Sequence, residues 1–169
     1  MESALTPEEI IAQLAATPTA LAMLVADATD ARLDSAAEGE WPVRVVLAHL
    51  RDEESIVGRL RIERMLAEIV PEFALFDPEP WERGRSRERD RKEILLADFA
   101  LQRQATLGLL RSLRPAEWAR TGHHPKQGTV TIATWATYWL NHDANHLGQV
   151  ERLLGETLSE VRARRARPG

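Results

Sequence analysis

Apolar side chains recur every three or four positions along four long stretches of this chain, and this periodicity constrains the fold more than any other feature. The stretches cover residues 7–29, residues 43–69, the segment from near Ser86 to residue 114, and residues 131–154. Such spacing places one face of an α-helix against a core, because a helix turns once every roughly 3.6 residues. No segment shows the alternation of a convincing strand. The sequence therefore predicts an all-α fold built from four long helices.

Residues at the ends of these stretches are typical of helix boundaries. Thr6 can accept a hydrogen bond from the first turn, Pro7 suits the first helical position, and Glu9 completes a capping box. Pro71 stops the second helix, and Gly155 stops the fourth. The four helices can thus be placed before any tertiary information is used.

The chain has 169 residues, of which 44% are hydrophobic and 28% charged, as is ordinary for one globular domain. We expect this domain to cover residues 1–156 and a polar, frayed C-terminal tail to cover residues 157–169. Residues 70–85 are a long connection rich in proline and aromatic residues. They either pack as a crossover or cover a site as a lid. A short helical turn is expected at residues 115–118.

Composition excludes several classes of function. The chain has no cysteine, so disulfides, a thiolate nucleophile and a cysteine-type zinc site are excluded. The net charge of −4 gives no reason to expect nucleic acid as a partner. The first residues lack the features of a secretion signal, and no stretch approaches the roughly 20 apolar residues of a membrane span. We expect a cytoplasmic protein with no membrane or nucleic-acid partner.

Two histidines in the fourth predicted helix, His142 and His146, have a spacing suited to joint metal binding. Four residues apart, they lie on one face a turn apart, and the same stripe carries Trp135 and Trp139. His49 occupies the inward stripe of the second predicted helix. Buried ionisable groups need partners. The pattern therefore predicts that three imidazole rings converge inside the protein on one divalent metal ion.

The polar residues around these histidines allow more than one interpretation. Glu53, one turn after His49, is either a fourth ligand, a base that takes a proton from the nucleophile, or the partner of an arginine. Asp143 and Asn145 either orient the ligands or face solvent. A hydrogen-bonded polar layer of histidines with Asp143 and Gln149 would explain the same pattern without a metal.

Three neutral imidazoles suit zinc, nickel, iron or manganese, and they leave at least one coordination position open, as catalytic sites do. The segment from His142 to His146 is similar to the His-Glu-x-x-His zinc protease motif with Asp for Glu. The shorter Asp weakens a general-base role, and no strand region indicates a protease cleft. A di-iron bundle needs two Glu-x-x-His pairs, and the chain has none.

Other residues and motifs carry weaker signals. His123 and His124 lie in a glycine- and proline-containing loop, where they are ordinary loop residues or approach the site from the mouth of the bundle. Trp81 and Trp139 could line a pocket, although helical spacing makes Trp139 a core residue. The chain contains no phosphate-binding glycine loop, serine nucleophile elbow or dinucleotide fingerprint.

Four short segments together resemble the DinB/YfiT-like superfamily. They are WPVRVVLAHLRDE at residues 41–53, FDPEPW at 76–81, GTVTI at 128–132 and HDANHLGQ at 142–149. The first resembles that family's motif around its first ligand, and the last resembles its final His-x-x-x-His-x-x-Gln motif. The resemblance spans roughly residues 5–155, with the segments in the expected order.

This resemblance implies a four-helix bundle with a long crossover connection and a metal bound by His49, His142 and His146. It commonly implies zinc or nickel, frequent homodimers, and activities that include thiol-dependent transferases and isomerases and some metal-dependent hydrolases. The thiols concerned are mycothiol, bacillithiol and glutathione. No departure from the family pattern occurs at the three ligands.

Three hypotheses follow. The first is an enzyme that acts on a small molecule, preferably a thiol-dependent transferase and otherwise a hydrolase, in which the metal activates the nucleophile and Glu53 is a base or an outer-shell partner. The second is a metal-binding protein without catalysis, with a closed coordination shell and no substrate-sized pocket. The third is a bundle whose histidines form a polar layer without metal.

Overall fold

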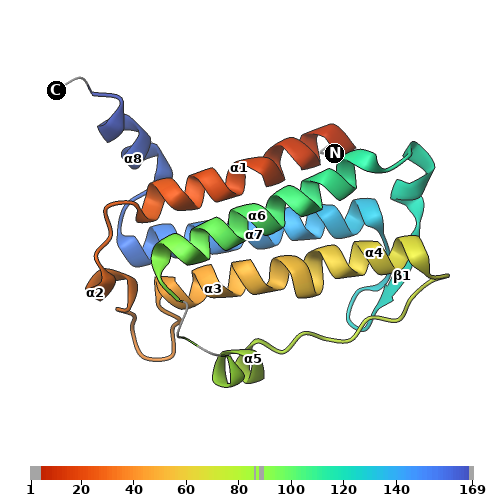
Figure 1. The fold of residues 1–169 in the computed structure, drawn as a ribbon, viewed down its shortest axis with the longest axis horizontal. Helices are drawn as coiled ribbons and strands as arrows, with labels where there is room; N and C mark the ends of the chain where they lie inside the picture. Colours follow the sequence, from red (N-terminus) through yellow and green to blue (C-terminus); the bar gives the residue numbers. More distant parts are fainter. Residues whose placement is uncertain (1–4, 86, 88–89, 168–169) are drawn as a thin grey trace.

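A computed structural model describes residues 5–85, 87 and 90–167, and most of them lie in four long helical segments packed side by side (Figure 1). The first segment packs against the third and fourth, and so does the second, and the buried apolar residues between them form two clusters. These segments are α1 (Pro7–Val25), the run α3 (Val43–Glu53), η1 (Glu54–Arg59) and α4 (Leu60–Ala67), α6 (Lys92–Ser112), and α7 (Ile132–Leu154).

Helix α1 begins with the capping box that the sequence predicts. The Glu9 backbone N–H donates to Thr6 Oγ1 at 3.2 Å, and the Thr6 N–H donates to Glu9 Oε2 at 2.8 Å. By length and composition alone this helix could cross a membrane, with a mean hydropathy of 1.2 over its most apolar window. Its inward face is buried against α6 and α7, and we therefore interpret it as a core helix of the bundle.

The second segment is one continuous rod, as predicted, but it contains a π-helical turn, η1, between α3 and α4. It ends at Ala67, close to the predicted end at Ile69. A π turn holds an additional residue compared with an α turn, so it rotates the side chains that follow it. The apolar stripe continues through η1, which is why the periodicity gave no sign of this turn.

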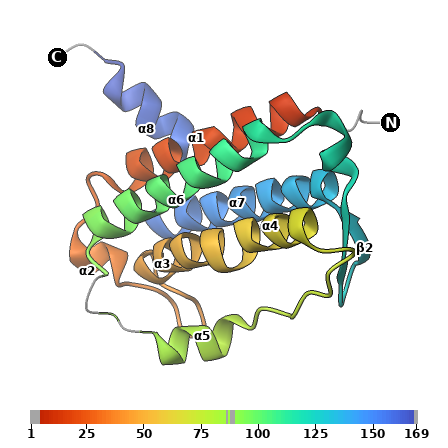
Figure 2. The same ribbon diagram turned by 45° about the vertical axis from the view of Figure 1, so that its right-hand side comes forward.

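The long connection after α4 crosses the outside of the bundle and carries the short helix α5 (Pro78–Gly84), which lies over α3 (Figure 2). Phe73 anchors the connection in the core, where it is buried. We placed the start of the third long helix near Ser86, which lies outside the described residues, and α6 begins at Lys92.

Two short strands form a hairpin before α7, whereas we predicted no strand. They are β1 (Thr121–His124) and β2 (Gly128–Thr131), antiparallel, with Thr121 opposite Thr131 and His124 opposite Gly128. Strands of four residues are too short to show an alternating pattern, so the prediction failed here. The turn places Gly128 at φ 71°, a backbone conformation that glycine adopts readily. The helical turn expected just before the hairpin is the 3₁₀ helix η2 (Pro115–Ala119).

The C-terminal residues differ from the frayed tail that we expected. Leu158–Arg165 form helix α8, capped by Thr157, and Val161 is fully buried against the bundle. One apolar residue among charged neighbours is too weak a sequence signal for a docked helix. The remaining short helix, α2 (Asp30–Leu33), lies in the connection between α1 and α3 and buries Leu33.

Candidate metal centre

The three histidines identified in the sequence meet between α3 and α7. His49 lies on α3, whereas His142 and His146 lie one turn apart on α7, and one ring nitrogen of each lies within 4.8 Å of the others. The Nε2 atoms of His49 and His142 face each other at 3.3 Å. Two nitrogens bound tetrahedrally to one zinc ion at about 2.0–2.1 Å lie about 3.3 Å apart. The rings are therefore spaced as ligands of a single ion.

Burial favours the neutral form of the His49 and His146 rings, which metal binding requires. The side chain of His49 is 5% exposed, and its burial, with the nearby His146 and His142, lowers its pKa from about 6.5 to about 2. Burial and the neighbouring His142 also lower the pKa of His146. A protonated ring here would lose hydration and face other potential cations, so the neutral form is favoured.

The hydrogen-bond pattern fits a divalent metal better than a polar layer. Gln149 Oε1 lies 2.9 Å from Nδ1 of His146, which leaves Nε2 of that ring for a metal. Among the described residues, Nδ1 of His49 and of His142 has no hydrogen-bond partner. When two neutral imidazole rings face each other, at most one of them donates an N–H to the other. A polar layer and a metal bound through Nε2 leave the same two Nδ1 atoms unpaired, so the distinction lies with Nε2 of His146, which the Gln149 contact leaves available and which suits a transition metal.

Glu53 belongs to the same cluster. Its Oε2 lies 3.0 Å from Nε2 of His142 and 3.6 Å from Nε2 of His49. No arginine forms an ion pair with Glu53 in the part of the chain that the structure describes. The alternative in which Glu53 is the partner of an arginine is therefore not observed. A carboxylate at this position can serve as a further ligand or as a base beside the metal.

A buried charge network lies behind the ligands, and its arginine was missed by our sequence analysis. Arg103 of α6 pairs with Glu54 at 2.8 Å and with Asp143 at 2.6 Å, and Thr17 donates to Asp143 at 2.7 Å. Asp143 therefore bonds Arg103 rather than a ligand ring or solvent, whereas Asn145 is exposed. The sequence does contain one sign that Arg103 is buried, because it lies within the apolar stripe of its helix.

Trp139 connects this network to a ligand. Its Nε1 donates to Glu54 Oε2 at 2.8 Å, and its ring stacks on His142 with centroids 4.7 Å apart. Gly58 in η1 makes room for the indole, because a Cβ there would lie 2.6 Å from Trp139. Trp139 is thus a core residue, as helical spacing predicts, and it also holds the His142 ring in place.

A cavity of about 320 Å³ opens beside the histidines. Five aromatic side chains line it, and they are Trp41, Phe76, Trp135, Tyr138 and Trp139. His124 also lines it, which agrees with the alternative that this loop approaches the site, and its Nδ1 accepts the backbone N–H of Lys126 at 3.3 Å. His124 is therefore engaged within its own hairpin, and His123 does not line the cavity.

The crossover connection covers this site. Trp81 of α5 donates from Nε1 to Asp52 Oδ2 at 3.0 Å, and its ring lies 5.4 Å from that of His49. For residues 70–85 the structure combines the two alternatives, because Trp81 packs the connection on the bundle and Phe76 and Pro78 line the cavity.

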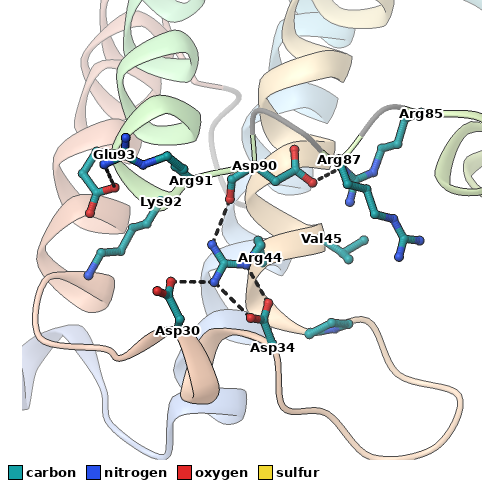
Figure 3. A pocket seen from close by; sticks show the side chains of 11 residues that line it. Asp30, Asp34, Arg44, Val45, Arg85, Arg87, Asp90, Arg91, Lys92 and Glu93 are labelled. Carbon is teal, nitrogen blue, oxygen red and sulfur yellow. Dashed lines mark hydrogen bonds and ion pairs between the residues drawn. The ribbon is translucent and has the colours of Figure 1, made fainter.

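A larger hollow of about 830 Å³ lies at the other end of α3 and is lined by charged residues (Figure 3). Arg44 binds Asp30 at 2.7 Å and Asp34 at 2.6 Å, and it donates to the Asp90 carbonyl at 2.8 Å. Because these charges satisfy one another across an open surface, we regard this hollow as a structural ion-pair network.

Comparison with known proteins agrees with this arrangement. A family model described as the DinB superfamily matches residues 13–150. An Oceanobacillus iheyensis protein named "Putative metal-dependent hydrolase" is 27% identical over 137 residues, which cover 80% of this chain and 78% of that protein. A solved structure of YfiT from Bacillus subtilis, titled "a probable metal-dependent hydrolase with an unusual four-helix bundle topology", has a TM-score of 0.74 at 24% identity and covers 93% of each chain. The four-helix bundle fold is thereby confirmed, and the chain belongs to the DinB superfamily.

Proposed function

We propose that this protein is a metal-dependent hydrolase of a small molecule, with His49, His142 and His146 as ligands of one divalent transition metal. Zinc or nickel is the first choice and iron or manganese the second. The observation that carries the proposal is the convergence of three imidazoles and the Glu53 carboxylate at the wall of one cavity. The relative from Oceanobacillus iheyensis, by its name, supports the same class of reaction.

The residues of the site have separate roles in the proposed reaction. A divalent metal held there supplies Lewis acidity, which polarises a substrate oxygen and increases the acidity of a nucleophile such as water. Glu53 Oε2 is placed to accept the proton that water loses when its oxygen attacks the substrate, and to return it to the leaving group. Gln149 orients His146, and the stack on Trp139 orients His142. These contacts pre-position two of the three ligands.

Transfer of a low-molecular-weight thiol is a second candidate, and the size of the cavity favours it. About 320 Å³ is roughly ten times the volume of one water molecule. In this reaction the thiol replaces water as nucleophile, Glu53 accepts the S–H proton, and the sulfur bonds to an electrophilic carbon of the substrate as its leaving group departs. A protein that only stores metal has no need of such a cavity, which argues against the non-catalytic alternative.

The test begins with protein purified without an affinity tag. We expect about one equivalent of transition metal by elemental analysis, and turnover of at least one compound in a panel of esters, amides and thiol-electrophile pairs. His142→Ala should lose metal and turnover together, because it removes a ligand. Glu53→Gln should keep most of the metal and lose about 100-fold or more of the turnover, the typical contribution of general acid–base catalysis.

The matched control is His123→Ala, a histidine of the adjacent hairpin that does not line the cavity, and it should behave as the wild type. Less than a tenth of an equivalent of metal in the wild type, or unchanged turnover in His142→Ala, would reject the proposal. Equal turnover in wild type and Glu53→Gln would remove Glu53 from the reaction.

A further inference from the structure

Arg61 of α4 is a buried cation on the wall of the cavity that holds the three histidines. Its side chain is 7% exposed, and it is the one arginine or lysine among the residues that line this cavity within the described chain. The mechanism above does not use it, and our sequence analysis did not identify it. A charged residue in this position needs a physical explanation, since moving a cation out of water is costly.

The contacts of Arg61 leave part of its guanidinium group available. The guanidinium carbon lies 4.6 Å from the centroid of the Trp135 ring and 5.3 Å from the centroid of the Phe73 ring, so the group packs against two aromatic side chains. At the edge, Nη2 donates to the Ala74 carbonyl at 2.6 Å. Of the five N–H donors of an arginine, the structure assigns a protein acceptor to this one alone among the described residues.

No carboxylate forms an ion pair with Arg61 in the residues that the structure describes, although the neighbouring arginines Arg59 and Arg64 both have one. Burial lowers the pKa of Arg61, and the negative charge of Glu53 opposes this effect. Glu53 itself is engaged with the histidines. A divalent cation at the histidines would add further positive charge to the cavity, so the cavity as a whole favours an anion.

We propose that Arg61 determines specificity by binding the carboxylate of an anionic small-molecule substrate whose apolar or aromatic body lies against the aromatic wall. The planar N–H edge of arginine matches a carboxylate, with two parallel hydrogen bonds. A single cation suits a monoanion better than a phosphate dianion. This inference rests on the proposed function, since it names the substrate class of the same cavity.

The experiment measures binding rather than turnover. The full-length protein is stripped of metal with a chelator, and benzoate and its neutral analogue benzamide are titrated while tryptophan fluorescence is recorded. We expect benzoate to bind about ten-fold or more tightly than benzamide in the wild type, as for a hydrogen bond between charged groups. Arg61→Gln should lower benzoate affinity to that of benzamide and leave benzamide affinity unchanged. A role of Arg61 in structure alone would affect both ligands equally.

Arg59→Gln is the matched control, because Arg59 lies two residues away and pairs with Glu63 outside the cavity. It should bind benzoate as the wild type does. If circular dichroism shows that Arg61→Gln does not fold, Arg61→Lys replaces it. This variant should bind benzoate more weakly than the wild type, since lysine lacks the planar pair of N–H donors. Benzoate affinity unchanged in the Arg61 variant, or no preference for benzoate in the wild type, would overturn the inference. Because the titration uses metal-free protein, it tests the role of Arg61 even if the protein binds no metal. The inference about Arg61 and the proposed function can therefore fail separately.

Discussion

The ring of His49 is enclosed by aromatic side chains on the side away from α7. Trp41 lies 5.1 Å, Trp81 5.4 Å and Phe76 6.0 Å from it between ring centroids. Two of these rings come from the crossover connection or α5, so the connection removes His49 from water. This enclosure is the main reason why the pKa of His49 falls so far below its ordinary value.

The lowered pKa of His49 predicts that the metal-free protein loses stability as the pH falls below about 6.5. In the unfolded chain His49 binds a proton near pH 6.5, whereas in the folded chain it does so only near pH 2. The unfolded state therefore takes up more protons between these values, and stability that is present above pH 6.5 is lost on acidification. Thermal melts in chelator at pH 7.5 and 5.5 measure this loss.

His49→Gln should show a smaller drop between these two pH values, because glutamine does not titrate. His123→Ala is the control, since that ring does not line the cavity, and it should keep the wild-type drop. An identical drop in wild type and His49→Gln would mean that the acid sensitivity comes from other groups.

At the scale of single elements, the π turn η1 decides where two consecutive carboxylates point. Glu53 ends α3 and contacts the histidines of α7, whereas Glu54 begins η1 and pairs with Arg103 of α6. π turns inside α-helices occur frequently at functional sites. Here the turn supplies one carboxylate to the site and another to the network behind it, and it brings Gly58 against Trp139.

Gly58→Ala is expected to destabilise the protein. The new methyl group would lie 2.6 Å from the Trp139 indole, which is held by Glu54 and stacked on His142. Overpacking of this kind costs about 1–3 kcal/mol. The free energy of unfolding from urea titration measures the effect, and metal affinity should fall with it, since His142 moves with Trp139.

Gly108→Ala provides the opposite control on α6. A Cβ at Gly108 meets no atom within 4 Å, so alanine should stabilise that helix by about 0.5–1 kcal/mol through its higher helix propensity. If both glycine substitutions changed stability in the same direction and by the same amount, the close approach of Gly58 to Trp139 would not be what constrains η1.

At the scale of the whole molecule, Arg103 connects all four long helical segments. From α6 it pairs with Glu54 of η1 and Asp143 of α7, and its Nη1 donates to the Leu14 carbonyl of α1 at 2.8 Å. Burial by itself raises the pKa of Glu54, but the charge and hydrogen bonds of Arg103 outweigh it and hold that pKa below its ordinary value. The bundle is thus organised around one buried cation between two carboxylates.

Arg103→Leu should therefore be among the most damaging single substitutions. It leaves two carboxylates buried without a cation, and breaking a buried pair in this way costs about 3–5 kcal/mol. Arg111→Leu, at an exposed position on the same helix, should change the free energy of unfolding by less than about 0.5 kcal/mol. Comparable losses in the two variants, measured by urea denaturation, would contradict this role of the network.

Local periodicity was sufficient to predict the four long helices and the histidines that face inward. Each inference needed only the spacing of residues within one helix, as between His142 and His146, because side-chain direction repeats with the helical turn. Capping residues such as Thr6 and Gly155 act on the same short range, and the structure places the helix ends close to them.

The arrangement around the histidines depended on contacts between segments far apart in the chain. No local pattern relates Arg103 to Asp143 or brings Arg61 to the cavity wall, and the π turn η1 leaves the apolar stripe intact. Periodicity specifies which face of a helix is buried, whereas the partner across the core is chosen by packing of the complete bundle. The three histidines that cluster could therefore be predicted from the sequence, and the charges that surround them required the folded molecule.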